Sequence, residues 1–211
     1  MSNRDQGNDF LVDSGITFSH NVDFLIHIKG DETSKILVDP YYDPFYFLYH
    51  ELLELLPKQA TYTQKNTGLF IEMYQALSAE IYLPVDDVTV PFSKHETGVL
   101  VYGNAHPNSE DYNSLADFYI SDEHIEIKIP WQLLNISDPS SKMMLSDFYQ
   151  NNTFAHEPIE GLFIGAYFAS DLAINYHINM AATTWDAWEM PTYHERLKQS
   201  YYIIREAFKQ R

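Results

Sequence analysis

Residues 115–129 carry the clearest strand pattern of the chain: Leu-Ala-Asp-Phe-Tyr-Ile-Ser-Asp-Glu-His-Ile-Glu-Ile-Lys-Ile. Two largely apolar arms, 115–120 and 124–129, flank a polar turn at 121–123, and this arrangement predicts an antiparallel hairpin. The second arm alternates between one apolar and one charged face, as expected of a half-buried strand. The apolar side chains are Ile125, Ile127 and Ile129, and the charged ones are Glu126 and Lys128.

Other segments repeat this pattern. Residues 22–28 alternate in the same way and are followed by a turn at 30–33 and a return strand at 35–39. Two further strand pairs are expected, from 88–92 with 98–102 and from 161–169 with 172–178. Many short strands with regular turns are typical of all-β domains. The sequence therefore predicts a mainly β chain that folds as an antiparallel, jelly-roll-like β-sandwich.

Helical signals interrupt the strands at three places. Asp43 is a suitable N-cap and Pro44 a suitable first residue for a helix that would run to Pro57. A second short helix is expected at 69–78. Near the end of the chain, Thr192 and Glu195 form a capping box ahead of an apolar stripe at Leu197, Tyr201, Ile204 and Phe208. We expect this last helix to pack on the sandwich.

The composition restricts the functions that the chain can have. Of its 211 residues 45% are hydrophobic, which is enough for one folded domain over 10–211 after a flexible leader at 1–9. The 30 acidic residues outnumber the 13 Lys and Arg and give a formal net charge of −17, which disfavours nucleic acids and anionic membranes as partners. The absence of cysteine excludes disulfides and thiolate sites. No apolar run is long enough for a membrane span, so we expect no direct membrane insertion.

The hairpin continues from Ile125 to Ser140 as Ile-Glu-Ile-Lys-Ile-Pro-Trp-Gln-Leu-Leu-Asn-Ile-Ser-Asp-Pro-Ser. This order of a strand, an Ile-Pro-Trp corner, a Leu-rich turn and an Asp-Pro-Ser stop resembles DOMON-like and family 9 carbohydrate-binding-module-like β-sandwiches of bacterial envelope proteins. The hairpin of 23–29 with 36–39 is similar to the first core hairpin of such domains. The resemblance covers about half of the chain and does not include the predicted helices. It implies a non-catalytic accessory or ligand-binding module of a longer cell-surface protein, in an extracellular or cell-envelope location, with a cytoplasmic one as the alternative.

Aromatic side chains beside carboxylates mark the candidate ligand site. Aromatic faces that stack on sugar C–H groups, next to carboxylates that accept hydroxyl hydrogen bonds, are typical of glycan sites. The candidate residues are Trp185, Asp186, Trp188, Glu189 and Tyr193, together with Tyr41 and Tyr42 where the first hairpin ends. In the alternative, the first group clamps the tail helix, and the two tyrosines are core rings beside a helix cap. Trp131 is expected to be a core side chain.

Metal binding and catalysis have weaker signals. The loop from Asn104 to Asp117 is rich in oxygen ligands and is where a structural calcium ion would bind, with a solvated turn as the alternative. The histidines show no metal-binding spacing, and no other cofactor is expected. No nucleophile elbow or phosphate-binding glycine loop occurs, so no catalytic residue is predicted. Two alternative functions are a glycan-active hydrolase or lyase with an acidic catalytic pair, and a structural domain that docks on its parent chain.

Overall fold

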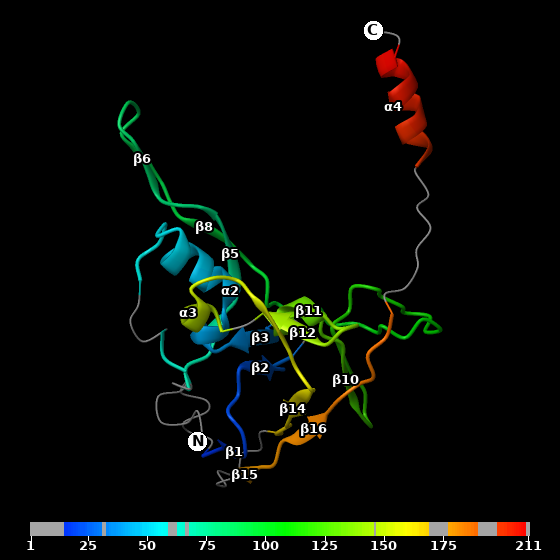
Figure 1. Cartoon of the computed structure of the whole chain (residues 1–211). Helices are drawn as coiled ribbons and strands as arrows, with labels where there is room; N and C mark the ends of the chain where they lie inside the picture. The colour runs from blue at the N-terminus through cyan, green and yellow to red at the C-terminus, as the bar shows by residue number, and fades with distance from the viewer. Residues whose placement is uncertain are drawn as a thin grey trace.

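The fold is known from a computed structural model, which describes residues 15–30, 33–58, 63–65, 68–145, 147–168, 177–189 and 198–209. Sixteen short strands in this part of the chain form seven sheets of two or three strands (Figure 1). All strand pairs are antiparallel except that of β1 (Thr17–Phe18) with β15 (His177–Ile178), which is parallel. The mainly β prediction is confirmed, whereas the sheets are small and none of them closes on itself.

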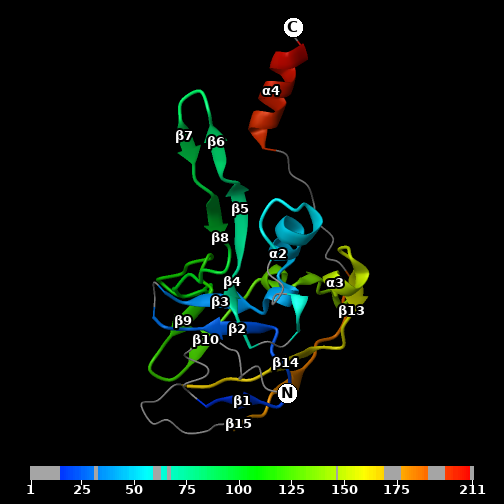
Figure 2. The same cartoon turned by 90° about the vertical axis from the view of Figure 1, so that its left-hand side faces the viewer.

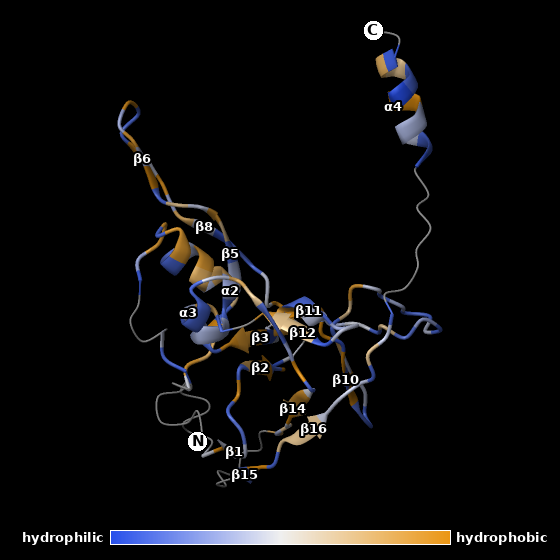
Figure 3. Cartoon of the chain, in the orientation of Figure 1, coloured by the Kyte–Doolittle hydropathy of each residue, from blue (hydrophilic) through white to orange (hydrophobic). Residues whose placement is uncertain are grey.

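The core lies against a three-stranded sheet of β2 (Phe24–His27), β3 (Lys35–Val38) and β4 (Ile71–Glu72). The β2–β3 pair is the predicted first hairpin, with Phe24 opposite Val38. Apolar side chains from four parts of the chain bury together on β3, which Figure 3 colours as hydrophobic. They are Ile36, Val38, Met73, Leu100 and Phe118.

The predicted hairpin at 115–129 is present as β9 (Phe118–Ile120) and β10 (Ile125–Ile127). Its apolar face is only partly covered, because Ile125 and Ile127 are exposed while Ile129 packs against the core. Among the described residues the hairpin is a two-stranded sheet, to which Tyr102 adds an isolated bridge at Phe118.

The helix after Asp43 begins where it was predicted and ends early. The Asp43 carboxylate accepts hydrogen bonds from the backbone N–H groups of Phe45 (2.9 Å) and Tyr46 (3.1 Å), which is N-cap geometry. One helical turn, α2 (Pro44–Tyr46), passes into a π-helix, η2 (Phe47–Leu52). The helix therefore stops at Leu52, before Pro57.

The helix predicted at 69–78 is wrong. Residues 71–78 form β4 and β5 (Tyr74–Ser78), and β5 pairs with β8 (Ser93–Glu96). An ion-pair cluster stabilises this arrangement, because Lys35 Nζ lies 2.5 Å from Glu72 and 2.8 Å from Glu96. The β5–β8 pairing and the Lys35 ion pairs join segments that are distant in the sequence. The helical spacing of apolar residues within 69–78 cannot predict such contacts.

Two predicted strand pairs have other partners. The strand at 88–92 is β7 (Val88–Val90), and it pairs with β6 (Ile81–Leu83) to extend the β5–β8 ribbon away from the body (Figure 2). Residues 98–102 contribute only isolated bridges. β14 (Leu162–Ile164) pairs with β16 (Ala181–Thr183), whereas 172–176 lie outside the described residues.

A second three-stranded sheet follows the corner at Pro130. A 3-10 turn, η4 (Trp131–Leu134), ends at Asn135, whose φ of 59° is left-handed. The sheet consists of β11 (Ile136–Asp138), β12 (Met143–Leu145) and β13 (His156–Pro158), with α3 (Phe148–Asn151) between the last two strands. It places the Asp138–Lys142 turn next to the segment that follows β16.

The tail helix is confirmed as α4 (Gln199–Lys209), but its predicted packing is wrong. All its side chains are exposed, and Figures 1 and 2 show it projecting from the body. The capping box at Thr192 and Glu195 lies outside the described residues. Within the described ranges, no helix combines the length and the apolar character that crossing a membrane requires.

Candidate functional site

The segment after β16 lies along the Asp138–Lys142 turn. The backbone N–H of Trp188 donates to the Ser140 carbonyl (3.0 Å), and the Trp185 indole N–H donates to the Pro139 carbonyl (2.7 Å). The turn is itself held by Asp138, whose carboxylate accepts hydrogen bonds from the Ser140 and Ser141 hydroxyls, and these bonds lower its pKa. This well-bonded turn therefore fixes the Trp185 indole and the backbone of Trp188.

Three tryptophans gather at this surface. The ring centroids of Trp131 and Trp185 lie 4.9 Å apart at an interplanar angle of 40°. Trp131 is 36% exposed and Trp188 is 44% exposed, so the prediction that Trp131 is a core side chain is wrong. Trp131 lies in η4, which has no buried residue among its four. We call Trp131, Trp185 and Trp188 the tryptophan platform.

Polar groups border the tryptophan platform. Lys142 Nζ lies 5.8 Å from the centre of the Trp185 ring, within the range of a cation–π contact, and donates to the Thr184 hydroxyl (3.1 Å). Asp186 and Glu189 are exposed beside the indoles. The predicted ligand residue Tyr193 lies outside the described residues.

Tyr41 and Tyr42 have different partners and fit the alternative of core rings beside a cap. Asp39 accepts the Tyr41 backbone N–H (3.1 Å) and thereby caps η1 (Pro40–Tyr42). Tyr41 is buried and Tyr42 half-buried, and the two rings pack edge to face at 5.1 Å. The Tyr42 carbonyl accepts the Asn135 side-chain amide (2.6 Å). Neither ring offers a free face to a polymer at the tryptophan platform.

Asp147 ties Tyr41 to Lys65. Its carboxylate accepts hydrogen bonds from the Tyr41 hydroxyl and the Lys65 ammonium, and it caps α3 by accepting the Gln150 N–H (3.1 Å). Partial burial opposes ionisation of Asp147, but the bonds from Lys65 and Tyr41 outweigh it and lower the pKa of the carboxyl. Burial, with the bond to Asp147, raises the pKa of Tyr41. This is a structural network that joins three separate parts of the chain.

Replacing Asp147 by asparagine is expected to lower the free energy of unfolding by about 1–3 kcal/mol, because an amide leaves the Lys65 charge unpaired and offers one acceptor fewer. Urea unfolding at low and high salt measures the loss, which should persist in salt because the Asp147 side chain is only 12% exposed. Glu54→Gln is the matched control: it breaks the exposed Lys58 pair and should change stability by less than about 0.5 kcal/mol. Equal effects of both variants would contradict the structural role of Asp147.

Raised carboxyl pKa values occur at Asp23 and Asp43 rather than across a cleft. Burial raises the pKa of Asp43 to about 7, against the opposing backbone bonds from Tyr46 and Phe45. Burial and the nearby Asp39 carboxylate raise the pKa of Asp23 to about 6. Asp39 and Asp43 are fully buried and serve as helix caps, so they are not accessible to a substrate.

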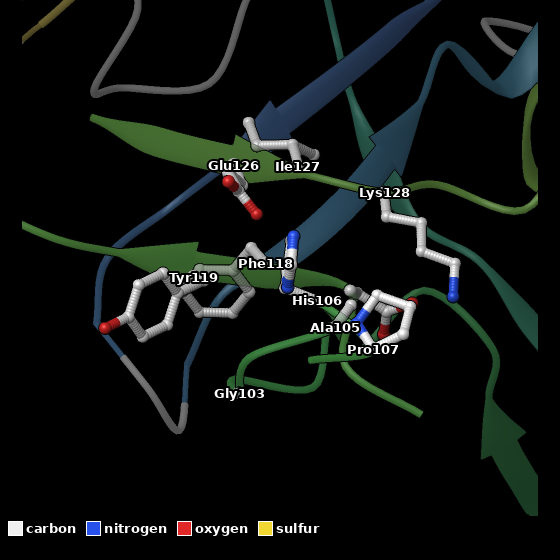
Figure 4. Close-up of a pocket in the computed structure, with 10 residues that line it drawn as sticks. Gly103, Ala105, His106, Pro107, Phe118, Tyr119, Glu126, Ile127 and Lys128 are labelled. Atoms are coloured by element: carbon white, nitrogen blue, oxygen red, sulfur yellow. The ribbon is translucent and has the colours of Figure 1, made fainter. Parts of the chain in front are cut away.

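A cavity of about 440 Å³ lies between the β9–β10 hairpin and the loop at 103–107. Figure 4 shows Glu126 and Lys128 extending from β10 toward this loop, which carries His106, while Tyr119 comes from β9. Glu126 accepts from His124 Nε2 (3.2 Å), and Lys128 has no side-chain hydrogen bond or ion pair among the described residues. The alternation of 125–129 predicts that Glu126 and Lys128 share one face, but no local pattern predicts that the 103–107 loop lies against this face.

The oxygen-rich loop at 104–117 uses several of its acceptors for its own turns. Asn104 accepts the His106 N–H, Asn113 accepts the Leu115 N–H, and Asp117 accepts the Val101 N–H. Among the residues that the structure describes, no three His, Asp or Glu side chains come together as a metal site. The calcium ion stays a prediction that the described residues do not test.

The chain matches no family model, no curated protein and no solved structure in the comparisons with known proteins. The resemblance to DOMON-like and family 9 carbohydrate-binding-module-like domains therefore has no independent support and stays a prediction. The geometry of the tryptophan platform is the basis for assigning a function.

Proposed function

We propose that this chain is a non-catalytic carbohydrate-binding module, an accessory part of a longer bacterial cell-surface protein in an extracellular or cell-envelope location. The observation that carries the proposal is the tryptophan platform, where indoles from two distant segments lie together at the surface beside Asp186 and Glu189. Sugar rings stack their C–H faces on aromatic rings, and carboxylates accept hydrogen bonds from sugar hydroxyls. We further propose that the small sheets belong to a β-sandwich of jelly-roll type.

An open platform suits a polymer better than a small free sugar. The three indoles are partly exposed, and binding them would not require the ligand to enter an enclosed cavity. A polysaccharide can cover several rings at once, and the Lys142 ammonium adds hydrogen-bond donors at the border. The ligand class that fits is therefore a neutral or weakly charged polysaccharide, since the net charge of −17 opposes strongly anionic polymers.

The test is depletion of the purified protein from solution by insoluble polysaccharides and by purified bacterial cell wall. We expect saturable binding that Trp188→Ala weakens about tenfold and that the double substitution of Trp185 and Trp188 by alanine abolishes, as for aromatic anchors at other interfaces. Trp188→Ala is the more informative single variant, because the hydrogen bond of Trp188 to the Ser140 carbonyl comes from the backbone N–H and is kept after the substitution.

Tyr112→Ala is the matched control, since Tyr112 is 49% exposed and lies in the 104–117 loop away from the tryptophan platform. It should leave the depletion unchanged. A parallel arm with EDTA tests the predicted calcium ion, whose removal should weaken binding if the loop holds it. No depletion by any matrix, or an equal loss in Tyr112→Ala, would contradict the proposal.

A further inference from the structure

The β6–β7 hairpin presents an apolar face to solvent. Ile81 lies opposite Val90 and Leu83 opposite Val88, so these four side chains share one face, while Tyr82 and Thr89 lie on the other. All four are exposed, and Val85 at the tip is 93% exposed. Figure 2 shows the hairpin extending from the body. A lone two-stranded hairpin is only marginally stable in water, so this one requires a partner on its apolar face.

Helix α4 has the same requirement. Tyr201, Ile204 and Phe208 recur at helical spacing and line a shallow apolar groove with a volume of about 420 Å³. An isolated helix of 11 residues is marginal in water, and most helical stability comes from packing of the apolar face. The apolar face of α4 therefore also requires a partner surface.

The charges of these two features are complementary. Residues 79–92 of the hairpin contain Glu80, Asp86 and Asp87 and no Lys, Arg or His. Residues 198–209 contain Lys198, Arg205 and Lys209 against a single acid, Glu206. A net positive segment is unusual in a chain with 30 acidic and 13 basic residues. Among the described residues, Arg205 and Lys209 form ion pairs with Glu206 of the same helix, and no acidic side chain of the body pairs with them.

The two features belong to one chain but lie apart on it. Figure 1 shows the hairpin and α4 projecting to the same side of the body and separated from each other. A second copy related by a twofold axis would bring the helix of each chain to the hairpin of the other. Such an isologous contact occurs twice, so each favourable interaction counts twice in the dimer.

We infer that the chain forms a twofold dimer in which α4 of each copy packs its Tyr201, Ile204 and Phe208 face on the Ile81, Leu83, Val88 and Val90 face of the other copy's hairpin. Arg205 and Lys209 then lie near Glu80 and Asp86 of the other copy. This inference is independent of the proposed glycan site, because no residue of the tryptophan platform takes part.

The oligomeric state of the full chain tests the inference first. Sedimentation equilibrium should give twice the 24.6 kDa mass of one chain at high concentration. Val88→Asp places a charge on the apolar face and should raise the dissociation constant at least tenfold, whereas Thr89→Asp, the adjacent residue on the opposite face, should change it little. Circular dichroism checks that both variants are folded. A monomer at every concentration, or equal effects of the two variants, would overturn the inference.

Charge exchange then distinguishes a dimer from packing within one chain. The hairpin variant Glu80→Lys/Asp86→Lys and the helix variant Arg205→Glu/Lys209→Glu should each be mainly monomeric, because like charges meet at both contacts. An equal mixture of the two should form heterodimers, since each helix then meets a hairpin of opposite charge. If α4 instead packs on its own hairpin, mixing produces no heterodimer, and the inference fails.

Discussion

Replacing Gly98 by alanine is expected to lower the free energy of unfolding by about 3 kcal/mol. A Cβ atom at Gly98 would lie 2.5 Å from the carbonyl oxygen of Ile36, closer than real Cβ atoms approach backbone. Ile36 is fully buried in β3, and its N–H donates to the Gly98 carbonyl (2.8 Å). The clash therefore separates two backbones that meet over the core.

Urea unfolding measures this loss, and Val99→Ala is the control from the adjacent position. Val99 is exposed and bridges to Lys35 through its backbone, which the substitution leaves in place. We expect Val99→Ala to cost less than about 1 kcal/mol. If Gly98→Ala were equally mild, the 98–102 segment would not lie as close to β3 as the structure places it.

The stability of the protein is expected to fall as the pH rises from about 4 to 7. Asp43 and Asp23 have pKa values raised to about 7 and about 6 in the folded chain, above the ordinary aspartate value of 3.8 that applies to the unfolded chain. Between these values the unfolded carboxyls lose protons while the folded ones keep them, so rising pH favours the unfolded state. Each pH unit between the folded and unfolded pKa corresponds to about 1.4 kcal/mol, so the combined loss is several kcal/mol.

Asp43→Asn separates this effect from the general repulsion of a chain with net charge −17. The amide oxygen can still accept the Phe45 and Tyr46 N–H bonds, but it does not ionise. We expect this variant to be more stable than the parent at pH 8, and its urea midpoint to depend less on pH. Asp86→Asn removes one charge from an exposed turn and should leave the slope nearly unchanged. A slope that Asp43→Asn does not reduce would contradict the role of Asp43.

Local signals explain which parts of the fold were predictable. Asp43 and Pro44 make a helix start from neighbouring residues alone, and the turn at 121–123 makes a hairpin in the same way. The helix expected at 69–78 failed because β5 pairs with β8 and because Glu72 binds Lys35, and these contacts join distant segments. Local spacing carries no information about such partners.

In the candidate site, too, the features that depend on neighbouring residues were predictable and those that depend on distant contacts were not. The density of aromatic and acidic residues around Trp185 is visible in the sequence, but the contact of Trp131 with Trp185 depends on how η4 and the segment after β16 meet. The cavity beside Lys128 likewise needs the 103–107 loop. Tyr41 is buried and Tyr42 is half-buried beside the Asp43 cap, which fits the alternative interpretation of core rings beside a helix cap.

The parallel pairing of β1 with β15 has a consequence for how the chain folds during synthesis. Thr17 lies opposite His177, and the Ser19 hydroxyl accepts the backbone N–H of Met180 (2.9 Å). About 160 residues separate these partners, and a ribosome adds residues at about 5–20 per second. Strand β1 therefore leaves the ribosome about 8–30 s before its partner exists. During that interval β1 has no partner strand, so the β1–β15 pairing forms late in synthesis, after the β2–β3 hairpin and the β9–β10 hairpin are complete.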